Sequence, residues 1–138
     1  MAGDRKCFFT YRSSEGFDIL VGRTAAENDE LTFRVAAQDD FWLHVAPTSG
    51  SHVVVRNPDH LARLPRTTLD EAAALAAFHS KSRNAGRVAV HWCRRKDVRK
   101  ERGSPAGQVQ LERFDQVKVR PEVPAAVVVV DGPATPER

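Results

Sequence analysis

The chain has 138 residues and a mass of 15.3 kDa, the size of one domain, and its 41% hydrophobic and 28% charged residues exclude a fibrous, low-complexity or wholly disordered protein. Two cysteines are too few for a disulfide framework, and no apolar run resembles a membrane helix or a secretory signal, so we expect a cytoplasmic protein. The net charge is only +3, but residues 81–102 hold nine Lys or Arg against two acids, whereas the other 116 residues hold twelve bases against sixteen acids. Such a basic segment is typical of a surface that binds a polyanion, and a plain solvated surface is the alternative.

The first third of the chain predicts a hairpin followed by a helix. Residues 6–11 and 17–21 are apolar, aromatic-rich runs joined by a short polar loop, as in two paired strands. Residues 24–37 fit a strand by their alternating apolar residues, but Thr24 and Glu27 have the spacing of a capping box that begins a helix. We favour the helix.

The middle of the chain predicts two strands and a second helix. Residues 41–46 and 51–56 have strand composition and are separated by a turn. A capping box at residues 68–71 begins an alanine-rich helix, whose narrow stripe of small side chains we expect to continue through Ser80 to Arg83.

The last third of the chain predicts further strands, over residues 87–93, 108–111 and 116–120. Four prolines after residue 120 indicate a mobile, Pro/Val-rich tail over residues 122–138, in which residues 127–130 can add a short edge strand. The elements together predict a single α+β domain over residues 1–121, with a mixed or antiparallel sheet of about six or seven strands and two main helices packed on it.

The strand over residues 41–46 carries the side chains best suited to RNA. Asp40, Trp42 and His44 alternate with apolar residues and so share one face, and the next turn brings Ser51 and His52 beside them. Aromatic rings stack on bases, and His and Ser hydrogen-bond to phosphate or ribose. The alternative is a second small core, in which Trp42 is buried and Asp40 bonds to His44.

Eight short motifs follow one another along the chain: residues 15–23 (EGFDILVGR), 28–31 (NDEL), 40–45 (DFWLHV), 50–53 (GSHV), 69–73 (LDEAA), 78–80 (FHS), 98–100 (VRK) and 105–109 (PAGQV). In this order and spacing they resemble the NFACT-R domain, the RNA-binding domain of the NFACT proteins of ribosome-associated quality control. The resemblance covers residues 6–121 and implies tRNA or ribosomal RNA as the ligand and the large ribosomal subunit as a partner. Nothing resembles the N-terminal NFACT, helix-hairpin-helix or coiled-coil parts of the large NFACT proteins, so we expect a stand-alone domain without their alanine-tailing activity.

The residues and the resemblance together give the candidate nucleic-acid-binding residues. The cations would neutralise phosphates and release counterions, Trp42 would stack on a base with a contribution of about 1–3 kcal/mol, and the His and Ser side chains would position ribose or phosphate. The candidates are Asp40, Trp42, His44, Ser51, His52, Ser80, Arg83, Arg94, Arg95, Lys96, Arg99 and Lys100.

Other functions stay open at this point. His44 and His52 have the residue types for metal-independent RNA cleavage, one as base and one as acid, and participation in RNA modification is a related alternative. A zinc site would need His44, His52, His91 and Cys93, without the usual short ligand spacing, and Cys93 next to two arginines is a candidate reactive thiol. A module that docks on a ribosomal or NFACT protein is the last alternative. We expect no catalytic residue, metal or cofactor. The sequence does not distinguish RNA from DNA and does not predict the oligomeric state.

Overall fold

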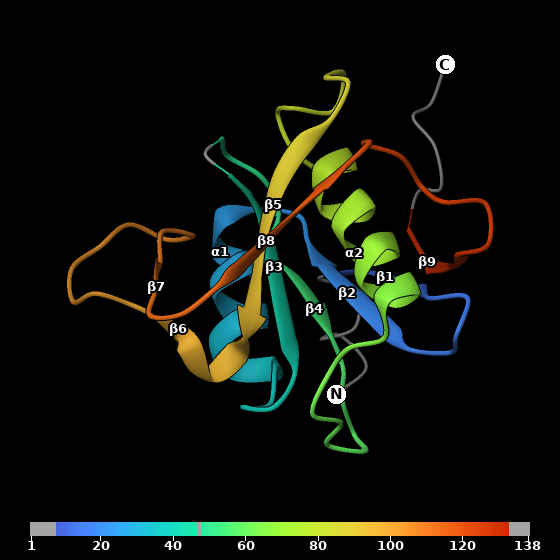
Figure 1. Ribbon diagram of the computed structural model, residues 1–138. Coiled ribbons are helices and arrows are strands. Elements are labelled where there is room, and N and C mark those ends of the chain that lie inside the picture. Colours follow the sequence, from blue (N-terminus) through green and yellow to red (C-terminus); the bar gives the residue numbers. More distant parts are fainter. Residues whose placement is uncertain (1–7, 47, 133–138) are drawn as a thin grey trace.

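The computed structural model describes residues 8–46 and 48–132 (Figure 1). These residues form two α-helices, α1 (Ala25–Glu30) and α2 (Arg66–Phe78), a π-helical turn (Leu31–Val35) directly after α1, and a 3₁₀ turn (Arg95–Asp97). The strands are β1 (Phe8–Arg12), β2 (Asp18–Gly22), β3 (Phe41–Ala46), β4 (Val53–Val55), β5 (Val88–Arg94), β6 (Val98–Arg99), β7 (Gln110–Leu111), β8 (Asp115–Val119) and β9 (Val128–Asp131).

Seven of these strands form one sheet in the order β8-β5-β3-β4-β2-β1-β9, and all neighbours in it are antiparallel. Strands β6 and β7 form a separate antiparallel pair. The predicted α+β domain, with six or seven strands and two helices, is therefore confirmed. None of the helices within residues 8–46 and 48–132 has the length and apolar composition needed to cross a bilayer.

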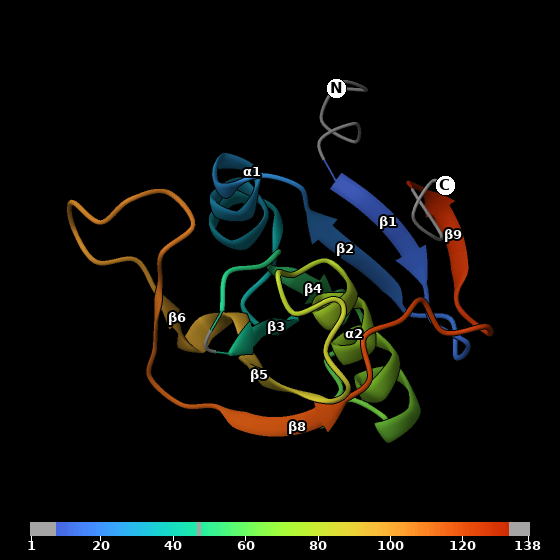
Figure 2. The same cartoon turned by 90° about the horizontal axis from the view of Figure 1, so that it is seen from above.

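The sheet buries a different core on each face. Figure 2 shows it curving around α2, with α1 on its opposite side. The predicted alternation along β3 explains this, because Phe41, Leu43 and Val45 belong to the core under α2, whereas Trp42 belongs to a smaller core with Leu31 of the π-helical turn. The small side chains of α2 let that helix pack closely on the sheet.

The predicted start of α2 is wrong. The helix begins at Arg66, after Pro65 in extended conformation, and Thr68 lies inside it. The backbone N–H of Thr68 instead donates to the Glu15 carboxylate, which reaches the first turn from the β1–β2 loop. A side chain far away in sequence therefore caps this helix, and the local Thr68-to-Glu71 pattern does not.

The predicted end of α2 is also wrong, because the helix stops at Phe78. Ser80 pairs with Gly50 in an isolated β-bridge, which draws the chain away from the helix axis. A side chain at Gly50 would collide with Ser80, since an added Cβ would lie 2.7 Å from the Ser80 Cβ. Ser80 and Arg83 therefore lie beside the β3–β4 turn and do not extend the stripe of small side chains.

The helix predicted over residues 24–37 is present as α1 and the π-helical turn that follows it. The Thr24 hydroxyl accepts from the Glu27 N–H at 3.1 Å, and the Glu27 carboxylate accepts from the Arg23 backbone and guanidinium. This is close to the predicted capping box, with Arg23 in place of Thr24 as the backbone donor to the carboxylate.

The C-terminal segment adds a strand to the sheet. Residues 128–131, part of the expected mobile tail, pair with β1 as the edge strand β9, and Val127 before them is buried in the main core. Residues 133–138 lie outside the described residues. The domain boundary drawn at residue 121 stays a prediction.

Candidate nucleic-acid interface

A cleft of about 1030 Å³ opens at one end of the sheet. Its walls are the β3–β4 turn at residues 48–51, the chain after α2 at residues 78–83, and the loop at residues 106–109. Strands β3 and β5 supply side chains to its floor. Segments from distant parts of the sequence thus build one concave surface.

Three histidines lie side by side across the floor of this cleft, and we call them the histidine row: His52, His44 and His91. His44 and His91 are directly opposite each other in the β3–β5 register, and the rings of His44 and His52 are 5.5 Å apart. Phe114, which is 47% exposed, extends the row by packing on His91 with ring centroids 4.3 Å apart. The floor therefore brings several flat rings close together.

A hydrogen-bond relay fixes the innermost histidine. The Trp42 Nε1–H can only donate, and it donates to the Thr32 hydroxyl oxygen at 3.0 Å. The Thr32 hydroxyl then donates to His52 Nδ1 at 2.8 Å, and His52 Nε2–H donates to the Gly107 carbonyl at 3.1 Å. Thr32, Trp42 and His52 are at most 1% exposed. His52 is thus held as the Nε2–H tautomer and ties the loop at residues 106–109 to the sheet.

The hydrogen bonds of the relay argue against RNA cleavage by His44 and His52. Both ring nitrogens of His52 have a protein partner, so neither is left to accept or donate a proton to a substrate. The surroundings also keep the rings neutral: burial, with the neighbouring His44, lowers the pKa of His52 to about 4, and burial lowers the pKa of His44. A general-acid imidazolium at His52 has no support in this geometry.

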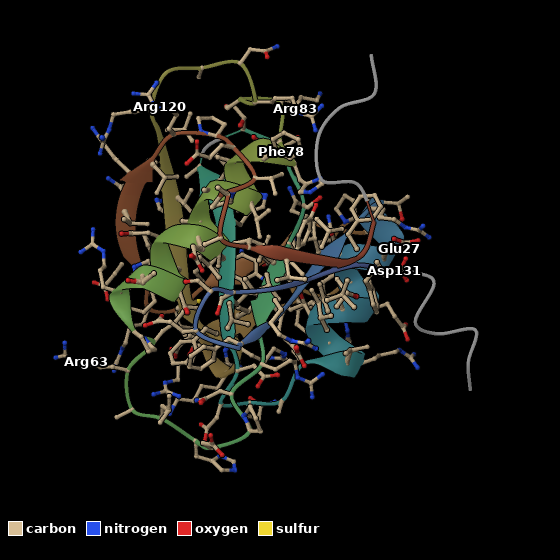
Figure 3. All side chains as sticks on the ribbon, turned by 90° about the vertical axis from the view of Figure 1, so that its right-hand side faces the viewer. Glu27, Arg63, Phe78, Arg83, Arg120 and Asp131 are labelled. Atoms are coloured by element: carbon tan, nitrogen blue, oxygen red, sulfur yellow. The ribbon has the colours of Figure 1, made fainter. Side chains whose placement is uncertain are left out.

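The rim of the cleft is cationic. Arg23, Lys81 and Arg83 line it, together with a fourth histidine, His79, and none of the lining residues that the structure describes is Asp or Glu. Arg83 lies over the Phe78 ring with its guanidinium carbon 4.0 Å from the ring centroid, and Figure 3 shows this pair at the end of α2. Burial and then the nearby Arg83 lower the pKa of His79 to about 4. An anion entering the cleft meets the positive charge of Lys81 and Arg83, while Arg23 is already paired with Glu27.

The structure divides the predicted site residues between two places. His44, Ser51, His52, Ser80 and Arg83 line the cleft, with Trp42 behind them. The remaining candidates lie elsewhere, because the β3–β5 register places Arg94 opposite Phe41 and Ala89 opposite Ala46, so the two ends of β5 are far apart. The candidates that do not line the cleft are Asp40, Arg94, Arg95, Lys96, Arg99 and Lys100.

Two of the predicted cations hold loops together. The Arg94 guanidinium donates to the carbonyls of Asp39, Leu61 and Ala62 and lies over the Phe41 ring. Arg95 donates to the Thr32 carbonyl and covers the Phe33 ring. Three hydrogen bonds from Arg94 and two from Arg95, which also donates to the Val98 carbonyl, take up part of the five N–H donors of each guanidinium.

Lys100 holds in place the loop whose residues 106–109 form one wall of the cleft. Its Nζ donates to the Pro105 carbonyl at 2.6 Å and to the Gln108 carbonyl at 3.0 Å, and it pairs with the Asp29 carboxylate at 3.1 Å. Asp29 also accepts from the Gly107 N–H, where a φ of +83° suits glycine.

The other two predicted cations of this segment lie at the surface. Arg99 is paired with Glu112. Lys96 is exposed, and phosphate binding by it stays a prediction.

Trp42 and Asp40 are interior residues. Trp42 is 1% exposed, so no face of its ring is open to a base, and the interpretation that it fills a second small core is correct. Asp40 is 2% exposed and accepts from the backbone N–H groups of Ala37 and Asn57, with Arg56 as its ion-pair partner. It does not bond to His44, so that part of the interpretation is wrong.

Several residues of the cleft were not among the candidate site residues, namely Arg23, His79, Lys81, His91 and Phe114. Arg23 and His79 belong to two of the motifs and Lys81 begins the basic segment at residues 81–102, so the sequence did carry a signal for these three. His91 was considered only as a zinc ligand, and within residues 8–46 and 48–132 no group of three or more His, Cys, Asp or Glu is placed to hold a metal. No feature of the local sequence marked Phe114, because a lone aromatic residue is usually interpreted as part of the hydrophobic core.

Cys93 does not have the character of a reactive thiol. It is buried in the smaller core with Trp42 and Val98, and burial raises its pKa to about 12. The adjacent arginines do not overcome this, so the structure does not support the alternative of an activated thiol.

Comparison with known proteins identifies relatives of this chain. The family described as the NFACT protein RNA binding domain matches residues 7–113. The "Rqc2 homolog RqcH" of Bacillus subtilis is 38% identical over 120 residues, which cover 86% of this chain and 20% of that protein. The "Ribosome quality control complex subunit 2" of Saccharomyces cerevisiae is 30% identical over 106 residues, 72% of this chain and 10% of that protein.

Among solved structures, the C-terminal part of the fibronectin/fibrinogen-binding protein from Streptococcus suis is similar, with a TM-score of 0.77 and 32% identity. The match covers 83% of this chain and 45% of that one. The chain thus spans a fifth or less of the length of the two curated relatives above.

Proposed function

Since the chain belongs to the family of NFACT protein RNA-binding domains, we propose that it binds RNA and that the RNA lies in the cleft beside the histidine row. The relatives act in ribosome quality control, as their names state. We therefore propose tRNA or ribosomal RNA as the ligand, the large ribosomal subunit as the partner and the cytoplasm as the location. Binding without catalysis is the role that the occupied ring nitrogens of His52 favour.

The observation that carries this proposal is the composition of the cleft. Lys81 and Arg83 stand at its rim, and its floor is made of imidazole rings, with no carboxylate among the described lining residues. Cations neutralise phosphates, while His and Ser side chains hydrogen-bond to phosphate and ribose oxygens. In this scheme Arg83 and Lys81 contact phosphates, and His44, Ser51 and Ser80 position the sugar-phosphate chain.

The experiment compares two double variants of equal charge. Lys81→Gln with Arg83→Gln removes the cations of the rim, and Arg63→Gln with Lys96→Gln removes two exposed cations elsewhere. Figure 3 shows Arg63 and Arg83 at opposite ends of the molecule. RNA affinity is measured for tRNA, ribosomal RNA fragments and duplex DNA over a series of salt concentrations, after thermal melting shows that each variant is folded.

The rim variant is expected to bind every RNA more weakly and to reduce the slope of log affinity against log salt by about 2, since each of the two removed cations neutralises one phosphate in the wild type. The control variant is expected to keep most of the slope. Equal reductions in affinity in both variants, or a reduction only in the control, would place RNA outside the cleft. Binding that responds to neither salt nor substitution would overturn the RNA proposal and favour docking on a protein. Equal binding of duplex DNA would remove the preference for RNA.

A further inference from the structure

Phe114 is unusual among the large apolar side chains of this domain. It is one of three that are substantially exposed in the described residues, the others being Val128 and Val130 on the edge strand β9. Its ring is not loose, because one side packs on His91 at a centroid distance of 4.3 Å and an interplanar angle of 32°. An exposed aromatic ring supported from one side is the arrangement that stacks on another flat ring.

The Phe114 ring also lines the cleft, where a second flat ring can reach it. Phe114 and His91 both line the cleft, and the histidine row continues from them to the buried His52. His44 is only partly buried and burial lowers its pKa, so its ring adds a flat, uncharged surface, whereas His52 is 1% exposed and supports the row from behind. On the rim, Arg83 lies over the Phe78 ring, and both residues line the cleft.

The shape of the cleft limits what can enter. Its volume of about 1030 Å³ is at the upper end of small-ligand sites, which hold molecules of about one or two nucleotides in size. A base pair inside a duplex exposes no ring face, and the A-form major groove is too narrow for side chains. Unpaired bases can be splayed out and stacked on Phe, His or Arg.

From this geometry we propose that the cleft takes an unpaired stretch of RNA, with one base stacked on the exposed face of Phe114 and its phosphates at Lys81 and Arg83. This inference rests on the proposed function and adds the class of RNA. Phe114 is then the residue that selects single-stranded RNA, because only a base that is not stacked on its neighbours in the RNA can stack on the Phe114 ring.

The test uses a single-stranded RNA of eight nucleotides with 2-aminopurine at successive positions, and a blunt duplex of the same sequence. The proteins are the full chain and its variants Phe114→Leu, which keeps an apolar side chain without the ring, Phe114→Tyr, which keeps the ring, and Val130→Ala, which removes an exposed apolar side chain on β9. Because Phe114 is exposed, all variants are expected to melt near the wild-type temperature.

We expect the single strand to bind more tightly than the duplex, and 2-aminopurine fluorescence to be quenched at one position. Phe114→Leu should weaken single-strand binding by about 5- to 150-fold, which corresponds to the usual contribution of one stacked base, and should abolish the quenching. Phe114→Tyr and Val130→Ala should bind as wild type does. Duplex binding equal to single-strand binding, or a Phe114→Leu variant that binds and quenches normally, would overturn this inference and leave RNA binding in the cleft intact. An absence of RNA binding in the wild type would overturn the proposed function itself.

Discussion

Replacement of Thr32 by Val tests the relay that holds His52. Valine has nearly the shape of threonine, so Thr32→Val removes the hydroxyl with little change in volume. The Trp42 Nε1–H and His52 Nδ1 then lose their partner in a place where all three residues are at most 1% exposed. A buried polar group left unsatisfied costs about 1–3 kcal/mol, so we expect the free energy of unfolding to fall by about 2–6 kcal/mol for the two groups together.

Thr32→Ser is the matched control, because it keeps the hydroxyl and removes one methyl group, for a loss of about 1 kcal/mol. Urea unfolding measures both variants, with the slope m unchanged if the native and unfolded states keep their compactness. In the NMR spectrum, the Trp42 indole N–H should shift in Thr32→Val and stay near its place in Thr32→Ser. A valine variant as stable as the wild type, or a serine variant as unstable as the valine one, would refute the relay.

Three further predictions concern the residues around the cleft and the smaller core. Lys100→Met should increase hydrogen exchange and proteolysis in the loop that Lys100 holds, whereas Lys96→Met at an exposed position should not. His52 and His79 have pKa values of about 4 in the folded protein against 6.5 when unfolded, so the unfolded chain binds more protons below pH 6.5. The free energy of unfolding should therefore decrease as the pH is lowered from 6.5 to 4, by up to about 1.4 kcal/mol per pH unit for each residue. The same dependence on pH in a folded His79→Gln variant would contradict this for His79. In a chain whose other cysteine is replaced by Ser, Cys93 should react with a thiol reagent at pH 8 only after unfolding, and rapid labelling of the native protein would contradict its burial.

The fold was predictable where the pattern is local. The alternation along Phe41–Ala46 determines which side chains face α2 and which face the smaller core, and both cores formed accordingly. The N-terminus of α2 was not predictable, because Glu15, more than fifty residues away, supplies its cap. Local capping signals carry no information on a partner from a distant loop.

The candidate site was predictable only in part, for a related reason. The positive charges of residues 81–102 are close in sequence, but β5 carries them from one end of the sheet to the other. Arg94 then donates to backbone carbonyls of loops more than thirty residues away, and Lys100 donates to carbonyls five and eight residues away, so both apparent phosphate ligands hold loops in place. The cleft itself arises from several distant segments whose meeting depends on the complete sheet order.

RNA binding in the cleft can be tested by an NMR titration of the isotope-labelled chain with a short single-stranded RNA, with backbone and aromatic signals followed together. We expect the largest shift changes at His44, His91 and Phe114 on the floor and at Lys81 and Arg83 on the rim. Changes concentrated instead around Arg94, Arg95 and Lys96, with the histidine row unaffected, would contradict binding in the cleft.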